Sequence, residues 1–243
     1  MFKRVGFFHF VQNPHDPFGS LERALKDKST DYRSGDISGS LIVLPEAFNL
    51  GKPYYHPQHP KTTWTPGGAR FPLWIALEQL RTSAATHDVV FVAGLVGEQF
   101  SSAYWVDRDG PPRLMGHKLG DDRSGNYRIP CGGYEDRLVE LCGACVGALI
   151  CLDALDAGES AVIRRRENLI SHIRNRDRLH GILCVPVRRG DQWNPRSPRI
   201  DGLYCIVADS GGAHPSFVAK GPEIIASPTN PQQNEIGFAE FVA

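Results

Sequence analysis

Uncharged apolar runs that alternate with amphipathic helical patterns restrict the possible folds of this 243-residue chain more than any other feature. Short apolar runs bounded by turn residues predict strands buried on both faces, and such strands require helices outside the sheets. The strands expected from this pattern cover residues 3–12, 41–45, 89–97, 101–106, 111–118, 141–153, 182–187, 203–209, 216–220, 223–227 and 237–242. Helical spacing of apolar residues predicts helices over residues 18–28, 69–86 and 160–178.

These elements follow one another as strand, helix, strand, helix and strands, then as strand, helix and a strand-rich end. This alternation indicates an α/β fold in which helices cover the outer faces of the sheets. No shift in composition and no internal repeat divides the chain, and 243 residues suffice to bury a large core. We therefore expect a single domain over residues 1–243.

Charge and cysteine content argue against several classes of function. The 27 basic and 27 acidic residues balance, so no net positive charge favours nucleic acid or an anionic membrane as the partner. The apolar run VGFFHFV near the N-terminus is far shorter than the roughly 20 residues of a membrane-spanning helix. Six cysteines do not indicate a disulfide-rich scaffold in a chain of this length, and no secretory leader pattern precedes them. We expect a cytoplasmic protein.

The run from Leu141 to Asp153, LCGACVGALICLD, carries no charge before its last residue and has a cysteine near its end. Cys151 therefore stands where a buried strand opens into a turn, which is a suitable position for a nucleophile. The alternative is that Cys151 is a small buried apolar residue, as free cysteines often are.

Two charged residues stand at similar places in the chain. Glu46 directly follows the run LIVLP, and Lys118 follows the predicted hairpin strand that ends in MGH. Functional residues collect at strand ends in open sheets, where loops surround a crevice. A buried carboxylate or ammonium needs a partner, so Glu46 and Lys118 are expected to pair with each other or with the thiol. Each could alternatively be an ordinary solvated side chain.

The motifs LIVLPEAF, GHKLG and ALICLD occur in this order, and with them the sequence resembles the nitrilase superfamily of carbon–nitrogen hydrolases. The resemblance extends to LERAL, TPGG and VFVAGLVGE, and to the later segments GLYCIVADSGG, SFVAKGPEIIAS and EIGFAEF. It thus covers nearly the whole chain. It implies the four-layer αββα sandwich of that superfamily, a catalytic triad of Glu46, Lys118 and Cys151, and a homodimer or larger homo-oligomer.

The reaction that this resemblance implies is hydrolysis of a non-peptide C–N bond in a small amide or N-carbamoyl compound. A thiol with a pKa of ~8.5 is mostly protonated at neutral pH, so Cys151 needs a base. Glu46 would take the thiol proton and later activate water, while Lys118 and the backbone N–H of Leu152 would bind the oxyanion. The intermediate would be a thioester on Cys151. This chemistry requires no metal and no organic cofactor.

The residues after the cysteine bear on the substrate class. Asp153 resembles the acid of the superfamily's Cys-Tyr-Asp amidase pattern, whereas nitrilases more often carry Trp-Glu at these positions. Amide hydrolysis is therefore favoured over nitrile hydrolysis, although Leu152 matches neither pattern. The superfamily usually continues with an aromatic residue, Pro-Glu and an arginine, where this chain has ALDAGES. This difference keeps open the alternative of a catalytically degenerate binding or scaffold protein.

Further residues are candidates for contacts with the substrate. Glu135, in the loop after the candidate lysine, could be a second active-site glutamate, and His117 could line the pocket. Leu152 and Asp153 follow the candidate nucleophile, and Trp193 lies in a Pro-containing loop. Solvation or simple packing is the alternative interpretation for each of these side chains.

The same loop, residues 188–201, replaces a helix that the superfamily carries between the corresponding strands. Its prolines, Pro195 and Pro198, do not fit a helix interior. We therefore expect an αββα sandwich that lacks one outer helix. The pocket would then be more open, or another subunit would cover it.

Two other patterns have interpretations that do not involve the proposed site. Cys142 and Cys145 form a CxxC, which a redox protein or a zinc site would use, but no second such pair exists. In a strand their side chains would also point to opposite faces. The six arginines of the helix over residues 160–178 alternate with acidic residues and predict a solvated outer face.

Overall fold

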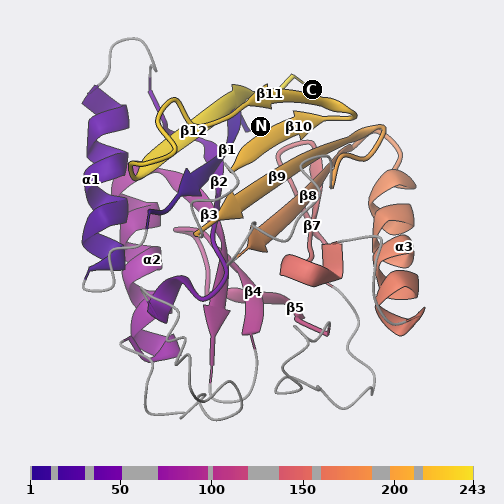
Figure 1. Ribbon diagram of the computed structural model, residues 1–243, viewed down its shortest axis with the longest axis horizontal. Coiled ribbons are helices and arrows are strands. Elements are labelled where there is room, and N and C mark those ends of the chain that lie inside the picture. Colours follow the sequence, from indigo (N-terminus) through magenta and orange to yellow (C-terminus); the bar gives the residue numbers. More distant parts are fainter. Residues whose placement is uncertain are drawn as a thin grey trace.

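The computed structural model describes residues 2–11, 16–30, 36–50, 71–97, 101–119, 137–154, 160–187, 198–210 and 216–242. Two six-stranded sheets lie face to face in the middle of the molecule (Figure 1). The helices α1 (Pro17–Thr30) and α2 (Leu73–His87) cover one sheet, and α3 (Ser160–Arg174) covers the other. This arrangement is the αββα four-layer sandwich expected from the sequence.

The first sheet has the strand order β12-β1-β2-β3-β4-β5. Its strands are β1 (Arg4–His9), β2 (Ser40–Leu44), β3 (Val89–Val96), β4 (Ser101–Val106), β5 (Arg113–His117) and β12 (Glu235–Glu240). β1, β2 and β3 run parallel, and the other pairs are antiparallel. All five residues of β2 are buried, which is why this strand reads as an uninterrupted apolar run.

The second sheet has the order β11-β10-β9-β8-β7-β6, and β7, β8 and β9 are parallel. Its strands are β6 (Val139–Leu141), β7 (Ala144–Ala148), β8 (His180–Val187), β9 (Leu203–Asp209), β10 (Phe217–Lys220) and β11 (Glu223–Ala226). One apolar cluster joins the two sheets: Phe7, Val43 and Trp105 of the first belong to it with Val146 and Ile206 of the second.

A second apolar cluster lies between the first sheet and its two helices. In α1 the buried residues Phe18, Leu21 and Leu25 recur at helical spacing and face this cluster, as does Leu80 of α2. Phe48, which follows β2, packs edge-on against Phe18 with ring centroids 5.1 Å apart. The chain just after β2, where Glu46 stands, is thus held from the helix side.

The run from residue 141 to residue 153 is not one strand, contrary to the prediction. β6 and β7 form a hairpin across Cys142 and Gly143, whose φ angles are 55° and 77°. Positive φ at both turn residues suits the right-handed twist of paired strands. β7 ends at Ala148, and the 3₁₀-helix η3 (Cys151–Ala154) follows after two residues of irregular chain. The candidate nucleophile therefore lies on a turn beyond the strand.

The remaining boundaries differ from the expectations by a few residues. The helix predicted to reach residue 178 ends at Arg174. Residues 188–197, in the loop predicted to have lost an outer helix, lie outside the described residues, so that loss stays a prediction. Within the described ranges, no helix combines the length and the apolar character that crossing a membrane requires.

Candidate active site

Glu46 and Lys118 form a buried ion pair. Glu46 follows β2 and Lys118 follows β5, and Lys118 Nζ lies 2.9 Å from Glu46 Oε1 and 3.2 Å from Oε2. Only 5% of Glu46 and 7% of Lys118 is exposed to solvent. Ser101 Oγ donates a further hydrogen bond of 3.0 Å to Oε1. The two charges that the sequence analysis expected to pair are thus paired.

Backbone hydrogen bonds hold both residues of this ion pair. Lys118 N–H donates to the carbonyl of Ser101 at 2.9 Å, which ties it to the first residue of β4. Glu46 N–H donates to the carbonyl of Val187 at 3.2 Å, and Val187 is the last residue of β8 in the second sheet. Because this bond crosses between the sheets, Glu46 stands at the seam of the sandwich.

The electrostatic environment keeps Lys118 protonated. Burial by itself would lower the pKa of the Lys118 ammonium, but the negative charges of Glu46, Cys151 and Asp153 and the hydrogen bonds to Glu46 outweigh it. The pKa of Lys118 is raised well above its ordinary value as a result. The charge that Cys151 carries when it is ionised raises the pKa of Lys118, so the thiol and the ion pair share one electrostatic environment.

Cys151 follows β7 of the second sheet. Leu149 N–H donates to the carbonyl of Cys184 on β8 at 3.1 Å, and Asp153 N–H donates to the carbonyl of Ile150 at 3.1 Å. The second bond closes a turn around Cys151, whose φ is 50° and whose exposed fraction is 7%. The left-handed conformation costs a residue with a side chain roughly 1–2 kcal/mol, and such strain is concentrated at functional sites.

Asp153 and Arg165 connect this turn with the segment around Lys118. Asp153 is fully buried, and its Oδ2 accepts hydrogen bonds from Leu119 N–H at 2.7 Å and from Arg165 Nη1 at 3.0 Å. The same Nη1 of Arg165 donates to the carbonyl of His117 at 2.7 Å. Both neighbours of Lys118 in the chain are therefore bound by this pair.

The prediction of a fully solvated arginine face on α3 is wrong for two of the six arginines. The side chain of Arg165 is only 12% exposed, and Arg166 Nε donates to the carbonyl of Ala154 at the end of η3, at 3.0 Å. Both residues lie three or four positions from the buried residues Val162 and Leu169, and hence on the apolar face of the helix. That spacing was the available signal for their inward direction.

His117 is held by the first sheet. Its Nδ1 lies 2.7 Å from Ser102 Oγ on β4, and 9% of the residue is exposed. Burial, followed by the charge of Arg165, lowers the pKa of His117, which favours the neutral imidazole at neutral pH. His117 is thus packed against β4 directly before Lys118, and its contact with a substrate stays a prediction.

For the other residues predicted to contact the substrate, the structure gives no side-chain contacts. Glu135 and Trp193 lie outside the described residues. Leu152 lies within η3, so its backbone N–H belongs to the turn that carries Cys151. The predicted substrate contacts of these three residues stay predictions.

The alternatives raised by the cysteines and by metal chemistry find no site in the described parts of the chain. Cys142 lies in the hairpin turn and Cys145 is buried in β7, and both are free thiols. Burial raises the pKa of Cys145, which disfavours its reactive thiolate. Among these described residues no group of three or more His, Cys, Asp or Glu side chains is placed to hold a metal ion.

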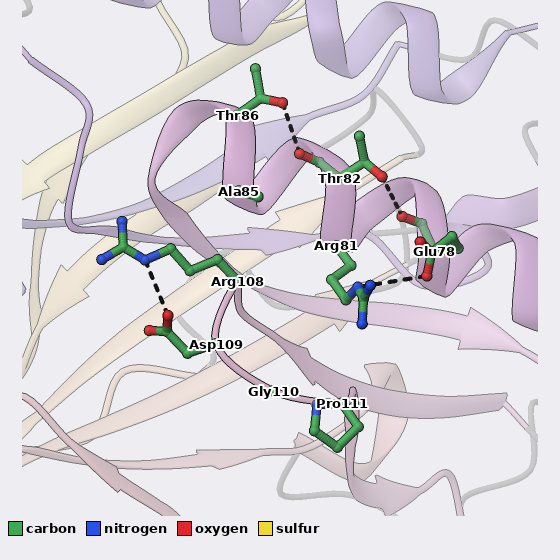
Figure 2. Close-up of a pocket in the computed structure, with 9 residues that line it drawn as sticks. All are labelled: Glu78, Arg81, Thr82, Ala85, Thr86, Arg108, Asp109, Gly110 and Pro111. Carbon is green, nitrogen blue, oxygen red and sulfur yellow. Dashed lines mark hydrogen bonds and ion pairs between the residues drawn. The ribbon is translucent and has the colours of Figure 1, made fainter.

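A groove of about 510 Å³ lies elsewhere, between α2 and the turn that joins β4 to β5 (Figure 2). Its charged side chains pair with one another: Arg81 lies 3.6 Å from Glu78, and Arg108 lies 3.3 Å from Asp109. These pairs are exposed, and the groove shares no lining residue with the Glu46–Lys118 site. We therefore regard it as a surface depression.

Solved structures with a similar fold include amidases. A variant of the amidase from Nesterenkonia sp. AN1, with acrylamide added to its active-site cysteine, matches with a TM-score of 0.65 and 13% identity, covering 98% of this chain and 93% of that one. Another variant of that amidase, described as from the nitrilase superfamily, matches with a TM-score of 0.67 and 15% identity, covering 98% and 90%. The chain has the nitrilase-type fold.

No protein-family model matches the sequence, and neither does any curated protein. At 13–15% identity the likeness concerns the fold, and one fold can support many functions. Function must therefore be inferred from the residues at the site.

Proposed function

We propose that this protein is a carbon–nitrogen hydrolase that cleaves a small amide or N-carbamoyl compound through a thioester on Cys151. Glu46 takes the proton of the thiol as the sulfur attacks the carbonyl carbon, and Lys118 with the N–H of Leu152 stabilises the resulting oxyanion. The proton passes to the leaving nitrogen, and ammonia or an amine departs. Glu46 then activates water, which hydrolyses the thioester to a carboxylic acid and restores the thiol.

The observation that carries this proposal is the buried ion pair of Glu46 and Lys118 at the seam where Cys151 arrives. Removing two charges from water costs several kcal/mol per ion, and apolar residues of similar size would stabilise the fold as well. A base and a cation kept buried near the Cys151 thiol, which lies on a strained turn, match the needs of thiol catalysis.

The substrate class follows from two considerations. The similar structures are amidases, and one of them is described as a complex with acrylamide, a small amide. Asp153 two residues after the cysteine also fits the amidase pattern rather than the nitrilase pattern. We therefore place a small linear amide before an N-carbamoyl compound and before a nitrile.

The test is a single-turnover experiment with a panel of small amides, N-carbamoyl compounds and nitriles. Mass spectrometry of the intact protein and of its peptides should detect an acyl adduct on Cys151, and ammonia should be released from the amides. Cys151→Ala should show neither. Absence of any adduct and of any released ammonia across the panel would contradict the hydrolase and favour a degenerate binding protein. Turnover of nitriles alone would assign a nitrile hydrolase.

A further inference from the structure

A single nitrogen of Arg165, on α3, makes two contacts. Its Nη1 lies 3.0 Å from Asp153 Oδ2 and 2.7 Å from the carbonyl oxygen of His117. The side chain of Arg165 is 12% exposed and that of Asp153 is fully buried, so these are contacts in a low-dielectric environment. Charge-assisted hydrogen bonds of this kind are stronger and more directional than neutral ones.

These contacts join two segments of the candidate site, the turn that carries Cys151 and the segment around Lys118. Asp153 belongs to η3, the turn that begins at Cys151. His117 directly precedes Lys118, and Leu119, which directly follows it, donates from its N–H to the same Asp153 Oδ2 at 2.7 Å. Asp153 and Arg165 thus bind the residues on either side of Lys118 and connect them to the turn that carries Cys151.

These two segments follow strands of different sheets. Lys118 follows β5 of the first sheet, and Cys151 follows β7 of the second. Apolar packing between the sheets is non-directional, whereas hydrogen bonds have preferred angles. The bonds from Leu119 N–H to Asp153 and from Arg165 to the carbonyl of His117 join the first-sheet side to the second-sheet side. They supply the angular definition that a nucleophile and its oxyanion stabiliser need.

We propose that Arg165, acting through Asp153, is a positioning residue that sets the geometry of Lys118 relative to Cys151. This proposal rests on the proposed hydrolase function. Arg165 acts on the proposed reacting groups through the backbone of His117 and Leu119 and through η3.

The experiment compares Arg165→Lys and Arg165→Gln with the matched control Arg164→Gln. Arg164 is the neighbouring arginine on α3, is exposed, and donates only to the carbonyl of Ser160 in its own helix, at 3.3 Å. The first readout is the rate of alkylation of Cys151 by iodoacetamide as a function of pH, followed by peptide mass spectrometry. It requires no substrate. The second readout is kcat and KM on an amide that the wild-type protein turns over.

A displaced catalytic group can lower the rate about 100-fold, so Arg165→Gln should lower kcat by about this factor with KM changed less than about threefold. The pH dependence of Cys151 alkylation should shift to higher pH, because a displaced Lys118 ammonium stabilises the Cys151 thiolate less. Arg165→Lys keeps the charge but not the planar fork, so its kcat should fall between the wild type and Arg165→Gln. Arg164→Gln should match the wild type in both readouts.

Each outcome is decisive for one of the two proposals. A wild-type protein with no amide turnover and an ordinary Cys151 alkylation profile overturns the hydrolase. Wild-type turnover with Arg165 variants unchanged in kcat and in alkylation profile overturns the positioning role alone. Should Arg165→Gln not fold, Asp153→Asn, which nearly keeps the shape and removes the charge, replaces it. A lowered melting temperature with an unchanged alkylation profile would then mark the pair as structural and overturn the proposal.

Discussion

The ion pair of Glu46 and Lys118 would be a poor device for stability alone. Its attraction must first offset the loss of water around two charges, and replacing such pairs by apolar residues is often neutral or stabilising. Removing one partner is a different matter, because the other charge stays buried without compensation. The effects of mutating Glu46 and Lys118 on the free energy of unfolding should therefore be strongly coupled, more strongly than for exposed ion pairs of this protein.

A double-mutant cycle tests this coupling. Lys118→Met should lower the free energy of unfolding by about 3–5 kcal/mol, because it leaves the Glu46 carboxylate buried without its ion-pair partner. Adding Glu46→Gln should recover part of that loss, so the double variant costs less than the sum of the single ones. Urea unfolding followed by circular dichroism measures all four proteins.

The matched control is the exposed pair of Glu78 and Arg81 on α2. Their closest charged atoms are 3.6 Å apart, and the side chains are 64% and 48% exposed. Removing either should change the free energy of unfolding by less than about 1 kcal/mol, since solvent screens such a pair. Single variants at Glu46 and Lys118 that cost no more than this control would contradict the buried coupling.

The end of β3 beside the site depends on one small residue. A Cβ on Gly94 would lie 2.7 Å from Glu46 Cα, 2.7 Å from Pro186 Cβ on β8 and 3.0 Å from the carbonyl oxygen of Pro45. These neighbours are backbone or a rigid ring, so they cannot move aside cheaply. The absence of a side chain on β3 thus lets the Glu46 segment and the second sheet approach each other.

Gly94→Ala should therefore separate these two segments. Overpacking of this kind costs about 1–3 kcal/mol in the free energy of unfolding, and it should lower activity further by displacing Glu46. Gly110→Ala is the control, because a Cβ there meets only Asp107 Oδ1 at 3.9 Å. Denaturant unfolding and the Cys151 acylation rate are the measurements. Equal effects at both positions would show that the close approach at Gly94 is unimportant.

The two helices on the first sheet are joined through Glu22. This carboxylate of α1 accepts hydrogen bonds from Ser83 Oγ and from His87 Nε2 of α2, the second at 3.1 Å. Burial acts to raise the pKa of Glu22, but the hydrogen bonds and the charges of His87 and Lys26 outweigh it and lower the pKa below 4.5. A carboxyl whose pKa is lower in the folded state stabilises that state when it is ionised.

The contribution of ionised Glu22 to the free energy of unfolding should therefore be complete above pH 4.5. It should be lost as the pH falls through the lowered pKa that Glu22 has in the folded state. Because 33% of the Glu22 side chain is exposed, we expect less than about 1 kcal/mol. The difference in free energy of unfolding between wild type and Glu22→Gln, measured from pH 3 to pH 7, should shrink toward acid. Ser83→Ala should weaken this pH dependence. A difference that grows toward acid would contradict the assignment.

At the scale of elements, periodicity predicted almost all strands and helices within a few residues. It missed the hairpin at Cys142 and Gly143 because Cys-Gly occupies a turn that Asn-Gly or Asp-Gly would have marked. The turn at Cys151 was likewise read as strand, since Leu149 and Ile150 continue the apolar run after the sheet has ended. A buried loop and a buried strand have the same composition, and only hydrogen bonding separates them.

The site was predictable to a similar extent. Glu46, Lys118 and Cys151 were singled out because charged and thiol groups at the ends of apolar runs are conspicuous. The pairing of Glu46 with Lys118 is confirmed, and the catalytic roles of the three residues stay predictions. Arg165 was missed because a charged helix face was interpreted as a whole, although this residue lies among the apolar positions of α3. The role of Gly94 was not predictable at all, because it depends on how closely two sheets approach one another in space.

The molecule as a whole places its candidate chemistry across the seam of the two sheets. Glu46 and Lys118 follow strands β2 and β5 of the first sheet, and Cys151 begins η3, which follows β7 of the second. Arg165 belongs to α3, which covers the second sheet (Figure 1), and binds Asp153 and the carbonyl of His117. The site therefore exists only while both sheets are packed together. One apolar cluster spans the sheets, so neither can leave the other without exposing a large part of the core.

This shared core predicts that the sheets unfold as one cooperative unit, as a single domain should. In hydrogen exchange at low urea concentrations, amides of β2 and β3 in the first sheet and of β8 and β9 in the second should exchange through one opening with the same free energy and the same urea dependence. The edge strand β11, whose Ile224 and Ile225 are 43% and 37% exposed, should open separately and at lower free energy. Exchange of β8 and β9 well before β2 and β3 would instead mean that the second sheet opens independently, and Cys151 alkylation would then report that opening rather than the intact site.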